Sequence, residues 1–389
     1  MPASMSFDFD TVIDRAASDS RKWRKFAGTD IIPLWVADMD FRTAPAVLEA
    51  LHRRVDHGVF GYGMAVEPVN EAVVEYCARR YGWQIEAPWI VWIPGLVTGL
   101  NIAAAALGDT GDGILTFTPI YPPFMSAPRN QRRATVRVPL AVRPDGRCEI
   151  DYNALTAALT PRTKHLLLCS PHNPVGRVFT RAELQRLAGF CAQHGITVTS
   201  DEIHCDLILD DIAHVPFASL SPDAAARTIT LMAPSKTYNM PGLGCSLAII
   251  SDADLRAAFQ RAIGGLVPEM NVLGFPACEA AFRHGEPWRQ ALLAYLRGNR
   301  DLIADFVARE LPGVKMTPCE ATYLAWLDVG SLKLQNPGKF FEQHGVGLAD
   351  GAQYGAEPGR FVRLNFGCAR SLLAEALARI KRGCAAAAV

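Results

Sequence analysis

The feature that most constrains the fold is a regular alternation of short apolar runs and helix-like stretches between residues 89 and 250. The helix-like stretches include 181–194, which Thr180 is placed to cap. Strands alternating with helices predict an α/β fold, in which helices wrap a parallel or mostly parallel sheet of the seven-stranded type. The strand candidates are 89–93, 113–117, 135–139, 165–169, 196–200, 228–232 and 247–250.

The regular alternation of short apolar runs and helix-like stretches does not continue after about residue 283. One long amphipathic stretch at 288–309 is followed by isolated strand candidates at 322–328 and 360–366. This pattern predicts a second, smaller α+β domain. We therefore expect three parts: an N-terminal arm that belongs partly to the small domain (1–45), a large domain (46–282) and a C-terminal small domain (283–389).

The composition favours a small-molecule partner. Lys plus Arg and Asp plus Glu both number 39, so the formal net charge is zero. The composition therefore shows no excess of positive charge of the kind that binds nucleic acid or an anionic membrane. The 10 cysteines form no C-x-x-C pair, which predicts reduced thiols and no metal site. The start of the chain does not read as a signal peptide, and no apolar segment is long enough to span a membrane, so we expect a cytoplasmic protein.

Polar and aromatic residues follow several predicted strands. In parallel α/β sheets the ligand site lies outside the carboxyl ends of the strands. Lys236 lies in a turn between two apolar runs, where loss of hydration disfavours its charged form, as a Schiff-base lysine requires. Most lysines at strand ends are solvated and have no catalytic role, so the turn taken alone does not establish one. The residues at strand ends are Val97, Thr98, Tyr121, Asn173, Asp201, His204, Ser235 and Lys236.

Together these residue types match the needs of pyridoxal 5′-phosphate (PLP). A lysine can form an imine with its aldehyde, and an aspartate can keep its ring nitrogen protonated. An asparagine can bond the ring oxygen, and a tyrosine can stack on the ring. The glycine turn 94–100 opens a helix, and a helix N-terminus with a serine nearby suits a phosphate.

Five motifs carry a resemblance that extends over nearly the whole chain. The chain resembles fold-type I PLP enzymes of the class I/II aminotransferase superfamily. It is most similar to the MalY/PatB group of cysteine–sulfur β-lyases, often called cystathionine β-lyases. The motifs are Trp-Val-Ala-Asp-Met-Asp-Phe (35–41), Ser-Pro-His-Asn-Pro-Val-Gly-Arg (170–177), Asp-Glu-Ile-His (201–204), Ser-Lys-Thr-Tyr-Asn (235–239) and Arg-Leu-Asn-Phe-Gly (363–367).

The resemblance implies a role for each cofactor residue. Lys236 is implied as the Schiff-base lysine and as the base at the substrate α-carbon. Asp201 is implied as the partner of the ring nitrogen, and Asn173 as the partner of the ring oxygen. Tyr121 stacks on the ring beside the reacting atoms. The remaining implied cofactor residues are Val97, Thr98 and Ser235 at the phosphate, and His204.

The resemblance also implies how substrate and a second subunit are bound. Arg363 clamps the substrate carboxylate through a two-pronged ion pair. Ala37 and Asn173 lie against the substrate. Tyr62 reaches the substrate and the cofactor phosphate bound by the partner subunit, which makes a homodimer part of the prediction.

Two positions depart from the aminotransferase pattern. Aminotransferases commonly carry a tyrosine where this chain has His204, and a phosphate-binding arginine where it has Gly244. Both departures fit the lyase group. The expected reaction is therefore β-elimination from L-cystathionine or a related L-cysteine S-conjugate, giving a thiol, pyruvate and ammonia.

Other interpretations stay open at this point. An aminotransferase shares every step up to removal of the α-proton, and a specialised PLP enzyme of secondary metabolism is a further possibility. A regulatory binding protein that keeps the fold is the non-enzyme alternative, although a dead site is expected to lose Lys236 or Asp201. His172 is expected to be a core histidine. Asp38 and Asp40 are interpreted as residues that pin the N-terminal arm, with direct contact to the substrate as the alternative.

Overall fold

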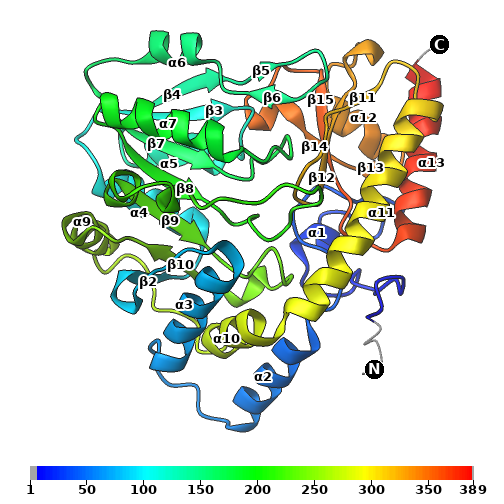
Figure 1. Cartoon of the computed structure of the whole chain (residues 1–389). Helices are drawn as coiled ribbons and strands as arrows, with labels where there is room; N and C mark the ends of the chain where they lie inside the picture. Colours follow the sequence, from blue (N-terminus) through cyan, green and yellow to red (C-terminus); the bar gives the residue numbers. More distant parts are fainter. Residues whose placement is uncertain (1–6, 388–389) are drawn as a thin grey trace.

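The computed structural model describes residues 7–387, and its centre is a seven-stranded sheet (Figure 1). The strand β10 (Ser246–Ile249) pairs antiparallel with both of its neighbours and every other pair in this sheet is parallel, so the sheet is mostly parallel, as predicted. Residues 1–6, on which the expectation of no signal peptide rests, lie outside the described range. The strand order is β2 (Ile90–Ile93), β10 (Ser246–Ile249), β9 (Thr228–Met232), β8 (Thr197–Asp201), β7 (Thr163–Cys169), β3 (Gly113–Thr118) and β4 (Ala134–Pro139).

Helices cover both faces of this sheet because its strands are apolar on both sides. In β7, Leu166 and Leu168 pack into one layer, while Leu167 and Cys169 pack into the other. The first layer is closed by α6 (Tyr152–Ala158), α7 (Arg181–Gln193) and α8 (Pro222–Ala226). The second is closed by α4 (Leu96–Ala106), α5 (Pro123–Asn130) and α9 (Ala253–Ile263). Thr180 caps α7 in a capping box with Glu183.

A smaller sheet follows the long helix α11 (Glu286–Glu310), which runs beside α13 (Arg370–Ala387) in Figure 1. This sheet is antiparallel, and α12 (Pro337–Gln343) packs on it. Its strand order is β11 (Lys315–Met316), β12 (Leu324–Asp328), β15 (Phe361–Asn365) and β14 (Ala349–Asp350). The smaller sheet and the long helix were both predicted from the sequence.

The N-terminal arm is tied to this smaller part. After the short α1 (Arg21–Arg24), β1 (Ile32–Pro33) pairs in parallel with β13 (Val346–Gly347). Helices α2 (Pro45–Asp56) and α3 (Glu67–Tyr81) then pack against α10 (Gly274–His284). A hairpin of β5 (Ala141–Val142) and β6 (Cys148–Glu149) completes the strands of the described chain. The proposed boundaries near 45 and 282 stay a prediction.

Several general features of the described residues bear on function. None of their helices is both long and apolar enough to cross a membrane. All 10 cysteines are buried and free. No cluster of three or more metal-ligating side chains occurs between residues 7 and 387.

Candidate active site

Four adjacent strands bring the predicted residues to one edge of the large sheet. Asp201 is the last residue of β8, and Asn173 follows the end of β7 by four residues. Lys236 follows β9 by four residues, and Tyr121 follows β3 by three. Because β9, β8, β7 and β3 are neighbours in that order, their carboxyl ends lie side by side.

These side chains line a cavity of about 260 Å³. Ten of the eleven predicted site residues line it: Ala37, Val97, Thr98, Tyr121, Asn173, Asp201, His204, Ser235, Lys236 and Arg363. The exception is Tyr62, which is fully exposed on the segment between α2 and α3. The structure therefore brings the predicted set together within one chain, while the roles assigned to its members stay predictions.

Lys236 is partly buried, and its amine donates a hydrogen bond to the carbonyl oxygen of Ala37. Burial lowers the pKa of this lysine to about 8 because the charged form loses hydration. The negative charge of Asp38 acts to raise this pKa, and that of Asp201 does so more weakly, whereas the positive charge of Arg363 lowers it further. A lysine with such a pKa is available as a neutral nucleophile or base near neutral pH.

Asp201 is buried beneath the cavity, and loss of hydration raises its pKa to about 7. Its Oδ1 accepts a hydrogen bond from the backbone N–H of Ile203 at 3.1 Å, which favours the charged form. Across residues 7–387 no cation forms an ion pair with this carboxylate. A buried acid that lacks a cation and lines the cavity fits the protonated ring nitrogen of PLP.

Arg363 is buried in β15 and joins the two parts of the molecule at the cavity. Its Nη1 donates to Oδ1 of Asn173 at 3.0 Å, and its Nη2 donates to the carbonyl oxygen of Trp35 at 2.9 Å. The Nε atom is buried and has no partner in the described chain. The guanidinium also lies 4.9 Å from the ring centroid of Tyr354. This arrangement holds a fixed cation next to Lys236, as a carboxylate site requires.

At its other end the cavity is lined by the N-terminus of α4, whose first turn contains Thr98, and Ser235 also lines the cavity. Free backbone N–H groups and the positive end of the helix dipole favour an anion there. Gly244 also lines this end, and its φ of +57° is in the left-handed region. A Cβ at this position would lie 3.2 Å from the carbonyl oxygen of Pro94. The backbone therefore favours glycine where aminotransferases commonly carry an arginine.

His204 lines the cavity as a neutral side chain. Burial, with the nearby charges of Lys236 and Arg363, lowers its pKa to about 3. Its Nδ1 is buried without a partner in the described chain, and its ring lies 6.2 Å from that of Tyr323. His172 is buried too, with Nε2 at 2.8 Å from the carbonyl oxygen of Pro119, and lies outside the cavity lining, as expected of a core histidine.

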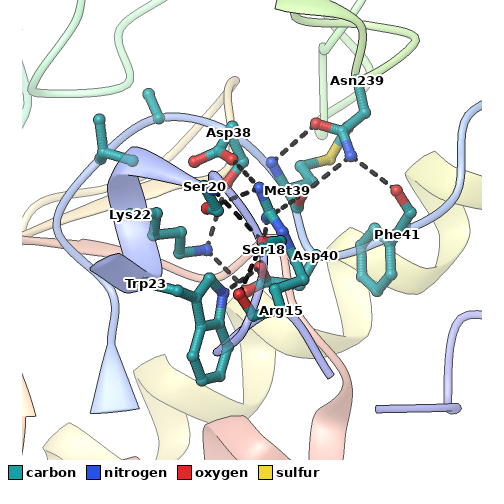
Figure 2. A network of polar contacts seen from close by, with 12 residues as sticks. Arg15, Ser18, Ser20, Lys22, Trp23, Asp38, Met39, Asp40, Phe41 and Asn239 are labelled. Carbon is teal, nitrogen blue, oxygen red and sulfur yellow. Dashed lines mark hydrogen bonds and ion pairs between the residues drawn. The ribbon is translucent and has the colours of Figure 1, made fainter. Parts of the chain in front are cut away.

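Sequence reasoning missed part of the network around Lys236. Tyr323, in the strand candidate 322–328, is buried, and its hydroxyl donates to the carbonyl oxygen of Ala37 at 3.0 Å. Arg15 and Lys22 from the N-terminal arm bind the acids of the 35–41 motif (Figure 2). No local pattern marks these two cations. Asn239 was part of the quoted lysine motif, and its proximity to the lysine was the available signal.

Comparisons with known proteins agree with this geometry. The family model for aminotransferase class I and II matches residues 29–380. Cystathionine beta-lyase PatB of Bacillus subtilis (strain 168) is 39% identical over 387 residues, which cover 96% of this chain and 99% of PatB.

Two solved structures have nearly the same fold. The crystal structure of OvoB shares 48% identity and a TM-score of 0.94, covering 97% of this chain and 99% of OvoB. Cystalysin from Treponema denticola, which contains PLP, shares 32% identity and a TM-score of 0.93, covering 97% of this chain and 99% of cystalysin. The protein therefore belongs to the class I and II aminotransferase family of PLP-dependent enzymes, within which it is similar to the C–S lyases.

Proposed function

We propose that this protein is a carbon–sulfur β-lyase that acts on L-cystathionine or a related L-cysteine S-conjugate. The observation that carries the proposal is the single cavity in which Lys236, Asp201 and Arg363 meet, with Gly244 and His204 at the two positions that depart from the aminotransferase pattern. The similarity to a relative named cystathionine beta-lyase supports the same reaction.

PLP supplies an electron sink that stabilises negative charge at the substrate α-carbon. Arg363 binds the substrate carboxylate and fixes the orientation of the α-carbon, with Asn173 as its neighbour. Lys236 takes the α-proton onto its amine nitrogen, which its pKa of about 8 allows. The Cβ–S bond then breaks and the sulfur leaves with the bonding electron pair as a thiolate. Hydrolysis of the remaining three-carbon enamine gives pyruvate and ammonia.

A second hollow supports a substrate longer than cysteine. A groove of about 710 Å³ between the N-terminal arm and the 35–41 motif shares Val36, Ala37 and Lys236 with the cofactor cavity. It offers space for a sulfur substituent next to the lysine amine. We therefore expect an extended S-conjugate to be a better substrate than cysteine itself.

The lyase proposal is tested by product analysis. Purified protein is incubated with L-cystathionine, and pyruvate and free thiol are measured in parallel, with L-cysteine as the comparison substrate. Equal amounts of pyruvate and thiol, formed without any added keto acid, are expected. Transfer of the amino group to an added keto acid, with neither product formed, would contradict the lyase reaction and favour the aminotransferase alternative.

We also propose a homodimer in which Tyr62 completes the neighbouring active site. Tyr62 is fully exposed in this chain, and several large apolar side chains close to it in the sequence are exposed as well. Such a patch is unusual on a monomer and suits burial against a second copy. The exposed apolar residues of this segment are Val55, Val59, Phe60, Tyr62, Met64 and Val66.

A further inference from the structure

The 35–41 motif forms a strap across the lysine turn, and we use this name for residues 35–41 below. Two side chains of the turn hold the strap. Lys236 donates to the carbonyl oxygen of Ala37, and Asn239 contacts Met39 and Phe41. The Asn239 amide accepts from the N–H of Met39 at 2.9 Å and donates to the carbonyl oxygens of Met39 and Phe41 at 2.9 and 2.7 Å (Figure 2). The position of the strap relative to the lysine is thus fixed by direct bonds.

The two acids of the strap have different surroundings. Asp40 is buried and accepts from three donors: Arg15 at 2.6 Å, Lys22 at 2.7 Å and Nε1 of Trp23 at 3.0 Å. Asp38 has only one side-chain partner, Arg15, which reaches its Oδ2 at 2.7 Å. The Oδ1 of Asp38 is buried and has no partner within residues 7–387 (Figure 2). Asp40 therefore anchors the arm, whereas Asp38 keeps an unused acceptor and lines the same groove as Lys236.

Few charged groups affect the protonation of the Lys236 amine. Its neighbours from the packed elements are Asp38 on the strap, Arg363 on β15 and Asp201 after β8. His204 is neutral and the Tyr323 hydroxyl is uncharged near neutral pH, since burial raises its pKa. Arg363 repels a protonated lysine, and of the two acids Asp38 acts on the lysine more strongly than Asp201. When Asp201 pairs with the cofactor ring, Asp38 is the remaining acid of this set.

We propose that Asp38 is a positioning residue for Lys236: across the groove that both residues line, its fixed and incompletely bonded carboxylate stabilises the protonated amine that donates to the Ala37 carbonyl. This inference rests on the proposed role of Lys236 as the cofactor lysine. During the reaction the amine must first be free of the cofactor and then carry the α-proton. Asp38 and the Ala37 carbonyl give that ammonium a defined place next to the substrate, while Arg15 fixes the carboxylate and Asn239 fixes the strap.

The test uses charge changes that preserve shape. Asp38→Asn removes the negative charge, and Arg15→Gln removes the cation that competes for it. Asp19→Asn is the matched control because Asp19 is an exposed acid that lines the same groove. For each full-length protein, the cofactor is stripped and the rate of PLP capture is measured against pH. The pH titration of the visible absorbance of the reloaded protein is the second readout, and thermal unfolding checks that each variant is folded.

Opposite shifts are expected from the two substitutions. Asp38→Asn lowers the midpoint of the pH dependence of PLP capture, and that of the absorbance titration, by about one pH unit. The reason is that a nearby carboxylate favours the charged amine, and the substitution removes it. With a pKa of about 8 in the parent, this change makes PLP capture at pH 7 about fivefold faster. Arg15→Gln moves the midpoints higher, and Asp19→Asn leaves them unchanged.

Three outcomes would overturn the inference. Unmoved midpoints in folded Asp38→Asn, with normal PLP capture by the parent, would leave Asp38 a structural residue and the proposed function intact. Shifts in the same direction for Asp38→Asn and Arg15→Gln would point to general loosening of the strap. Unchanged PLP capture by Lys236→Ala would refute the lysine assignment itself, and with it both proposals.

Discussion

The two ends of the cofactor cavity are built on different principles. At the end near the sheet, the charged side chains Asp201, Lys236 and Arg363 are held close together, and burial shifts the pKa of the first two. At the α4 end, the lining residues Val97, Thr98, Ser235 and Gly244 are all uncharged. Lys236 and Arg363 are the lysine and arginine residues among those that line the cavity in the described chain.

Because of this difference, we expect one end of the cavity to serve catalysis and the other to serve binding of the cofactor. A single chain supplies Lys236, Asp201 and Arg363, the charged groups assigned to the proposed reaction, and the strap adds Asp38. The α4 end, which we propose binds the phosphate, offers backbone N–H groups, hydroxyls and the helix dipole instead. Completion of that end by Tyr62 of the partner subunit is part of the proposed function. Mutations at the two ends are therefore expected to differ in kind, with loss of catalysis at one end and weaker binding of the cofactor at the other.

The largest effect is expected for Lys236→Ala. Loss of the base and of the covalent attachment should lower kcat by about four orders of magnitude and abolish the visible absorbance. Pyruvate release and the absorption spectrum measure the two effects separately. Lys315→Ala removes an exposed lysine and is the control. Retention of activity by Lys236→Ala would contradict the catalytic role of the cavity end near the sheet.

The next effect is expected for Asp201→Asn, with a fall in kcat of about 10²- to 10³-fold because the cofactor ring loses its fixed anion. The substitution also tests the pKa of Asp201. A pKa raised from 3.8 to about 7 by burial means that the folded, cofactor-free protein binds a proton which the unfolded chain has lost, so stability falls as the pH rises from 4 to 7.

Urea unfolding of cofactor-free protein at several pH values measures this dependence. The pH slope that belongs to Asp201 should disappear in Asp201→Asn and persist in Asp145→Asn, which changes an exposed acid. An identical pH slope in parent and Asp201→Asn would contradict the raised pKa.

A smaller effect is expected for subunit complementation at the phosphate end. Tyr62→Ala should weaken PLP binding, and a mixture with Lys236→Ala should regain activity, because each mixed dimer contains one intact site. Equal mixing and random exchange of subunits should restore about a quarter of the parental activity. Activity is assayed at limiting PLP, before and after the two variants are unfolded and refolded together. No recovery, although sedimentation shows mixed dimers, would place Tyr62 outside the neighbouring site.

The smallest effect is expected for Gly244→Ala. The left-handed backbone and the Pro94 carbonyl 3.2 Å away should cost about 1 kcal/mol of stability and slightly weaken PLP binding. Gly242→Ala is the matched control, since no atom lies within 4 Å of its Cβ position. Thermal unfolding and PLP titration measure both variants. Equal behaviour of the two would show that the backbone at 244 does not require glycine.

The sequence was sufficient for the large sheet because strand periodicity and turn residues are local signals. Lys236, Asp201, Asn173 and Tyr121 were found for the same reason, since each follows a strand end in a mostly parallel sheet. Helix α5 was not predicted because it begins at Pro123 and contains Pro128, and proline more often marks a turn, although it is also suited to a helix start.

The contacts that surround the lysine could not be predicted because they join residues far apart in the chain. Asp40 binds Lys22 in the arm, and Ala37 meets Tyr323, which lies 286 positions further along the sequence. Nothing in the local pattern distinguishes a buried lysine such as Lys22, with no exposed side-chain surface, from an ordinary solvated one. Such partners follow from the tertiary packing of the arm against β13 and β15.

The most direct measurement is the chemical trapping of the cofactor. Borohydride reduction of the purified, PLP-loaded protein fixes the cofactor to the amine that carries it, and tryptic peptides are then analysed by mass spectrometry. Because trypsin does not cleave after a modified lysine, the expected product is a single peptide covering 228–256 that bears the reduced cofactor. Unmodified peptides 228–236 and 237–256, with the label on another lysine or on none, would contradict the central role of Lys236.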